Sequence, residues 1–142
     1  MSHIINPDSA GKERTRLTRA IVLAIRELAQ KTEPGAESRD LAAFIALALN
    51  IVDGTIDDSV AAWEKRGYWV KADKFRMEWA WSGQLAEVMR SAVLAEDWTG
   101  VAQASARIAG RLSKFSVTPG HRLGHPWIGA WQELKNKRAH VG

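Results

Sequence analysis

The chain has 142 residues, of which 46% are hydrophobic and 25% are charged, and its formal net charge is +4. These values are typical of one ordinary globular domain and exclude the disordered and fibrous classes. The absence of cysteine excludes a disulfide framework, thiolate metal sites and a cysteine nucleophile. The longest apolar run, 41–52, is shorter than the roughly 20 apolar residues that a membrane-spanning helix needs. We therefore expect one helical domain over 1–142, cytoplasmic and without a membrane partner.

The first predicted helix spans 7–31. Asn6 followed by Pro7 is typical of a cap and a first helical position. Behind this pair, apolar residues recur at three- and four-residue spacing from Leu17 to Leu28, which indicates an amphipathic helix. The proline and glycine that follow Lys31 predict its end.

The second predicted helix begins with Ser38 as its N-cap and runs to about Arg66. Asp40 then lies in the first turn, where a carboxylate favours the positive end of the helix dipole. The predicted helix continues across Gly54, which costs about 1 kcal/mol relative to alanine in mid-helix and leaves a kink or break there as the alternative. Gly67 is a candidate C-cap.

Two of the predicted helices carry more apolar surface than one small bundle can easily cover. Residues 41–52 are apolar nearly all round, which predicts a buried central helix or one covered by a second copy of the chain. The third predicted helix, 68–95, has two apolar stripes, one through Trp79 and the other through Val70 and Met77. We therefore predict a homo-oligomer that buries residues of the second and third helices between chains.

The C-terminal third contains two more predicted helices. Asp97 is a typical N-cap for a helix over 98–115, and the stretch 116–125 is rich in glycine and proline and predicts a loop. Pro126 then starts a short last helix. Because no alternating strand pattern is visible, the predicted fold is an all-α, up-and-down bundle of four long helices plus a short C-terminal helix.

The segment from Trp63 to Trp81 concentrates large aromatic and charged residues. It contains four of the seven tryptophans between five basic and three acidic residues. The aromatic rings suit a buried core, which is the interpretation we favour, and the same mixture suits an exposed surface that grips a nucleic acid or an acidic peptide. The candidate contact residues are Trp63, Trp69, Lys71, Lys74, Arg76, Trp79 and Trp81.

Positive charge is concentrated at the C-terminal end of the chain. Residues 99–142 hold seven Lys and Arg against one Glu, a net charge of +6. Such asymmetry indicates a polyanion or an acidic partner surface, although a basic tail kept for solubility explains it equally well. The candidate polyanion-binding residues are Arg107, Arg111, Lys114, Arg122, Lys135, Lys137 and Arg138.

Two weaker patterns concern metal binding. Asp53, Asp57 and Glu64 share one side of the second helix and could supply oxygen ligands to Mg²⁺. His121 and His125 are four residues apart, but the glycines and proline around them predict a loop without fixed geometry. An N-cap role for His125 or a phosphate contact is the preferred interpretation, and we predict no metal site.

The predicted function follows from these patterns and from the missing signatures of common enzymes, such as a nucleophile elbow or a phosphate-binding glycine loop. We predict a non-enzymatic, oligomeric interaction protein that uses no cofactor and has a possible protein partner. The alternative is a nucleic-acid-binding subunit that uses the basic C-terminal third. A metal-dependent enzyme on the acidic side of the second helix is the third hypothesis.

Overall fold

The computed structural model describes residues 7–141, with side chains from 9 to 137, and these residues form helices and no strand. The predicted all-α class is therefore confirmed. Asn6, the predicted first cap, lies outside the described residues. The helices are α1 (Pro7–Ala29), α2 (Ala36–Lys65), α3 (Trp69–Glu78), α4 (Trp81–Leu94), α5 (Trp98–Arg111) and α6 (Ala130–Val141).

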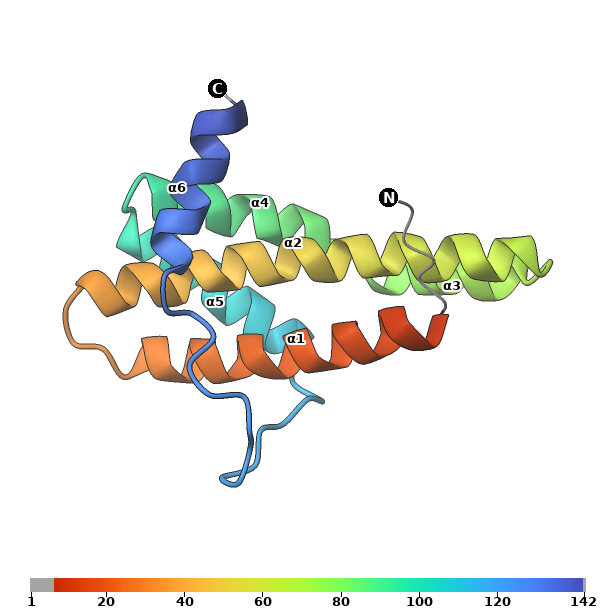
Figure 1. The fold of residues 1–142 in the computed structure, drawn as a ribbon, viewed down its shortest axis with the longest axis horizontal. Coiled ribbons are helices and arrows are strands. Elements are labelled where there is room, and N and C mark those ends of the chain that lie inside the picture. Colours follow the sequence, from red (N-terminus) through yellow and green to blue (C-terminus); the bar gives the residue numbers. More distant parts are fainter. Residues whose placement is uncertain (1–6, 142) are drawn as a thin grey trace.

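The helices form an up-and-down bundle around α2 (Figure 1). α1 and α2 lie antiparallel, and α3 followed by α4 runs back along α2. α5 packs on α4 and also reaches α1, whereas α6 crosses α2 near its N-terminal end. α5 ends at Arg111, earlier than the predicted end at 115, and a turn follows it.

α2 is the central helix because α1, α3, α4 and α6 all pack against it. Most of its apolar run is buried by these neighbours, including Leu41, Ile45 and Leu49, which are completely inaccessible. The buried positions between them are mostly alanine, and short side chains let neighbouring helices approach closely. Of the two alternatives for 41–52, burial as a central helix therefore holds for most of the run, and Ile51 is its one large apolar side chain that remains exposed, at 45%.

The predicted third helix, 68–95, is two helices rather than one. The chain turns at Trp79 and Ala80. Two backbone hydrogen bonds there run from residue i to residue i−3, the 3₁₀ pattern, instead of to residue i−4 as in an α-helix. The buried Ser82 hydroxyl donates to the Trp79 carbonyl oxygen at 2.8 Å and stabilises this turn. In an unbroken helix Trp79 and Trp81 would point to nearly opposite sides. The turn instead lets both rings enter the core.

Two further helix ends agree with the sequence patterns, whereas the start of α2 does not. Ser38 lies within α2, and its hydroxyl donates to the Glu33 carbonyl oxygen at 3.4 Å instead of capping the helix. Asp97 caps α5 as predicted, accepting a hydrogen bond from the Gly100 amide at 3.0 Å. Gly67 follows the end of α2 with a φ of 80°, the left-handed conformation that favours glycine.

α6 begins at Ala130 rather than at the predicted Pro126, and a residue from another helix caps it. The Asp40 carboxylate in α2 accepts hydrogen bonds from the Trp131 amide at 2.9 Å and from the Gly129 amide at 3.3 Å. The predicted N-cap role of His125 is therefore wrong. A negative carboxylate at a helix N-terminus also favours the dipole, so Asp40 fixes α6 against α2.

Gly54 lies inside an unbroken α2, as expected for a helix carried across this position, and the alternative of a break there does not occur. It is exposed, and a Cβ added there would meet no atom within 4 Å. We expect Gly54→Ala to raise the free energy of unfolding by about 1 kcal/mol, because alanine loses less backbone entropy in a helix. Denaturant unfolding monitored by circular dichroism measures this change.

Gly83 is the matched control for this substitution. A Cβ at Gly83 would lie 2.9 Å from the Asp53 Oδ2 atom, so α4 approaches α2 closely there. Gly83→Ala should therefore raise the free energy of unfolding much less than Gly54→Ala, or not at all. Equal stabilisation by both substitutions would contradict this assignment of the two glycines.

Candidate functional site

The aromatic segment 63–81 divides into a buried cluster and an exposed end. Trp79 and Trp81 are buried, and their rings stack with centroids 5.6 Å apart. Trp63 packs edge-on against Phe75 at 4.9 Å, and Trp79 lies 6.4 Å from Phe115 beyond α5. These rings join α2, α3 and the end of α5, so this part of the segment is core, as favoured from the sequence.

Arg76 and Lys71 are held by neighbouring side chains. Arg76 Nη2 lies 2.9 Å from a Glu64 oxygen and Nη1 lies 2.6 Å from an Asp73 oxygen. The hydrogen bonds that Arg76 donates to Glu64 and Asp73 raise the pKa of Arg76 above its ordinary value. Lys71 Nζ lies 4.6 Å from the centre of the Trp63 ring, a cation–π contact. Lys74 is exposed and forms no ion pair within the described residues.

A partly buried arginine that the sequence did not single out completes this junction. The Arg14 guanidinium, from α1, lies 4.7 Å from the centre of the Phe75 ring. Its Nη1 donates to the Thr55 hydroxyl at 3.2 Å and to the Ser59 hydroxyl at 3.3 Å. Burial lowers the pKa of Arg14 from its ordinary value. Arg14 thus ties α1 to α2 and α3 through uncharged partners, which no charge pattern in the sequence would reveal.

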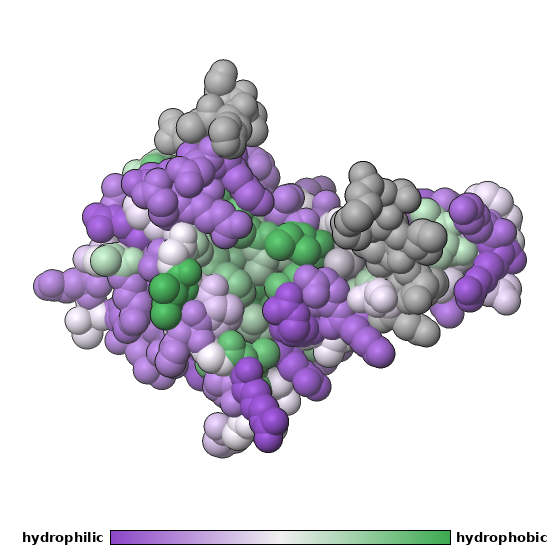
Figure 2. All heavy atoms as spheres, in the orientation of Figure 1, coloured by the Kyte–Doolittle hydropathy of each residue, from purple (hydrophilic) through white to green (hydrophobic). Residues whose placement is uncertain are grey.

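The exposed end of the segment carries large apolar side chains. Trp69 is 60% exposed, Val70 74% and Met77 78%, and Tyr68 is also exposed. At the end of the molecule where α2 turns into α3, Figure 2 shows weakly polar atoms beside strongly hydrophilic ones. We call Tyr68, Trp69, Val70 and Met77 the α3 surface. Of these, only Trp69 was a candidate contact residue, although Val70 and Met77 belonged to one predicted stripe.

The acidic residues of α2 do not converge on one point. Asp53 Oδ1 lies 3.1 Å from the Ser82 hydroxyl oxygen, whose single hydrogen it shares with the Trp79 carbonyl oxygen, and Glu64 pairs with Arg76. Asp57 is exposed. Among the residues that the structure describes, no group of three or more histidine and carboxylate side chains has an arrangement suited to a metal ion.

The basic candidates lie on α5, on α6 and in the segment between these helices, and the two helices have different neighbours. α5 packs on α4, whereas α6 packs on α2. Arg107 and Arg111 line one hollow of about 350 Å³ with Trp81 and Leu85. The described candidates are all exposed and form no ion pair with any described carboxylate: Arg107, Arg111, Lys114, Arg122, Lys135 and Lys137. The side chain of Arg138 lies outside the described part of the chain.

The two loop histidines have separate local roles. His121 Nδ1 accepts a hydrogen bond from the Leu123 amide at 3.2 Å, which stabilises a short turn. The His125 ring packs edge-on against Trp127 with centroids 5.2 Å apart. Both interactions are structural, and no third ligand joins the pair within the described residues.

Comparison of the chain with protein-family models, curated proteins and solved structures gives no match. None of the described helices is long and apolar enough to cross a membrane.

Proposed function

We propose that this chain is a non-enzymatic helical interaction protein that self-associates through the α3 surface. The observation that carries the proposal is the exposure of Val70 and Met77 at 74% and 78% next to Trp69. Exposed apolar patches rimmed by polar residues mark interaction surfaces. Only one side chain of α3, that of Ala72, is fully buried in its own chain.

The order of residues along α3 suits pairing with a second copy. In a two-fold dimer, each residue of an antiparallel helix pair faces the residue that is equally far from the midpoint. If the midpoint lies between Asp73 and Lys74, Val70 faces Met77 of the other copy and Asp73 faces Lys74. These four residues share one side of the helix by their three- and four-residue spacing. Both apolar contacts and opposite charges are therefore satisfied in a single register.

The absence of cysteine in the chain allows a direct test of this register. We expect chains carrying Val70→Cys to cross-link under mild oxidation to chains carrying Met77→Cys. Each variant alone should cross-link poorly, because identical positions would be about 10 Å apart along the helix axis and a disulfide needs Cα atoms within about 7 Å. Chains of two tagged lengths, separated by non-reducing electrophoresis, distinguish the products.

A matched control is Ser113→Cys, which places a thiol at an exposed position outside α3. If the cross-links arise from random collisions, this variant should cross-link as efficiently as the α3 pair. That result, or stronger cross-linking of each α3 variant with itself, would contradict the antiparallel pairing.

A second candidate function is polyanion binding, favoured by Arg107 and Arg111, which share one hollow and have no described carboxylate partner. Lys114 follows in the turn after α5, and its Nζ lies 5.5 Å from the centre of the Phe115 ring. Unpaired cations beside aromatic rings are the arrangement that single-stranded nucleic acids bind. We rank this candidate second because the remaining basic residues lie on other elements.

The salt dependence of binding tests this candidate. Each phosphate contact contributes about 0.9 to the slope of log K against log salt for duplex DNA and about 0.7 for single strands. Replacement of Arg107, Arg111 and Lys114 with Gln should therefore reduce the slope by about 2–3 units. It should weaken binding to unrelated sequences equally. Absence of any binding at about 50 mM salt would exclude this function, because screening is weak there.

A further inference from the structure

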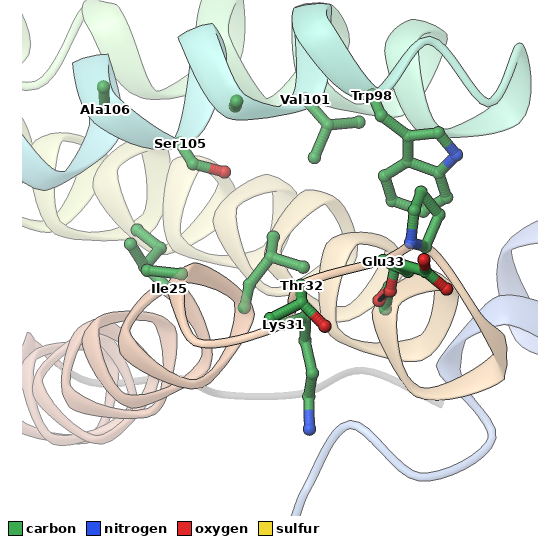
Figure 3. Close-up of a pocket in the computed structure, with 13 residues that line it drawn as sticks. Ile25, Lys31, Thr32, Glu33, Trp98, Val101, Ser105 and Ala106 are labelled. Atoms are coloured by element: carbon green, nitrogen blue, oxygen red, sulfur yellow. Dashed lines mark hydrogen bonds between the residues drawn. The ribbon is translucent and has the colours of Figure 1, made fainter.

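A cavity of about 400 Å³ lies between the end of α1, the connection to α2, and α5. Its walls are mostly apolar and include Ile25 and Leu28 from α1 and Trp98 and Val101 from α5 (Figure 3). This volume lies within the range of pockets that hold small organic molecules. It is separate from the α3 surface, because the two share no residue.

One buried polar atom in this cavity has no partner. Ser105 is 7% exposed, and its hydroxyl oxygen is the one buried side-chain polar atom without a hydrogen bond in the described part of the chain. Figure 3 shows the hydroxyl directed from α5 into the space facing α1. A buried hydroxyl without a partner costs about 1–3 kcal/mol, so such groups are rare and commonly have a role.

The charges at the rim indicate which ligands the cavity excludes. Lys31 lines the rim and forms an ion pair with Glu37, and Glu33 lies beside it. Because Lys31 is already paired and a carboxylate is close, an anionic head group gains little there. The flat Trp98 ring forms one wall and favours contact with another planar group.

We propose that this cavity binds a neutral, mostly apolar small molecule with one hydroxyl or carbonyl group, which hydrogen-bonds to Ser105. The apolar body displaces poorly bound water from the walls, and the polar group satisfies the Ser105 hydroxyl. This site is independent of self-association through α3, and either can be wrong without the other.

A pair of probes that differ by one hydroxyl tests the site. 1-Naphthol and naphthalene should both bind the wild-type chain, with chemical-shift changes in the amides of α5 and of the end of α1. 1-Naphthol should bind about three to ten times more tightly, the ratio that one net hydrogen bond contributes. Failure of both probes to bind up to the solubility limit of naphthalene would overturn the proposal.

Ser105→Ala removes the hydroxyl with little change in shape. We expect it to abolish the difference between the two probes while naphthalene still binds. Its thermal midpoint should not fall, because the wild-type hydroxyl has no hydrogen bond to lose. A retained preference for 1-naphthol would show that Ser105 is not the anchor, and a fall in the midpoint would assign Ser105 a purely structural role.

A second substitution tests the cavity itself. Ala102 is exposed at the rim of the cavity, so Ala102→Phe adds a ring there without disturbing the core. This substitution should weaken the binding of both probes at least tenfold. Gln103→Phe, the neighbouring exposed position outside the cavity, should leave binding unchanged. Equal effects of the two substitutions would overturn the location of the site.

Discussion

Trp79→Ala should lower the free energy of unfolding by about 3–5 kcal/mol, the cost of removing a large aromatic side chain from a core. Trp79 is 7% exposed, and it stacks on Trp81 and contacts Phe75 and Phe115. The loss of its ring opens a cavity where α3 turns into α4, so both helices lose packing contacts there. Urea unfolding monitored by circular dichroism at low protein concentration measures the change.

Trp69→Ala is the matched control, because it removes the same ring from a position that is 60% exposed. At a concentration where the chain is monomeric, this substitution should change stability by no more than about 0.5 kcal/mol. Similar losses for Trp69→Ala and Trp79→Ala would show that the division into a buried cluster and an exposed end is wrong.

The double substitution Val70→Glu with Met77→Glu should abolish self-association. Both side chains are exposed in the single chain, so the fold itself should tolerate the change. In the proposed dimer, each new carboxylate would face another across the two-fold axis, and burial of such like charges is strongly unfavourable. Sedimentation velocity over a concentration series measures the effect.

The control for this variant adds the same charge elsewhere. Thr99→Glu with Ser113→Glu changes two exposed positions outside α3. This variant should associate like the wild-type chain. If it dissociates to the same extent, net charge rather than the α3 surface governs assembly.

The sequence predicts the positions of most helices because their signals are local. Asp97 caps α5 through its own neighbours, and Gly67 ends α2 through its own backbone conformation. The turn between α3 and α4 has no such local signal, because it is formed by Trp79 and Ala80 and not by proline or glycine. It depends on the packing of two tryptophans against other helices, which is a tertiary effect.

The start of α6 was mispredicted for a similar reason. Its cap, Asp40, comes from α2, far away in the sequence, and the same residue has an ordinary local explanation in the first turn of α2. The apolar run of α2 allowed two interpretations, and the structure supports burial within one chain. Periodicity in the sequence shows which residues must be buried but not which neighbouring helix or chain buries them.

The candidate site was only partly predictable. The stripe through Val70 and Met77 was visible in the sequence, but its exposure depends on how α3 docks on α2. The unpartnered Ser105 hydroxyl has no sequence signal at all, because a serine in a helix commonly bonds to the preceding turn. Such sites can be identified only from the three-dimensional positions of the side chains.

The molar mass in solution, measured by light scattering across micromolar concentrations, tests the proposed self-association most directly. We expect the mass to rise with concentration towards twice the 15.7 kDa of one chain. The Val70→Glu, Met77→Glu variant should stay at the mass of one chain across the same range. A wild-type mass that remains at 15.7 kDa throughout would contradict the proposal.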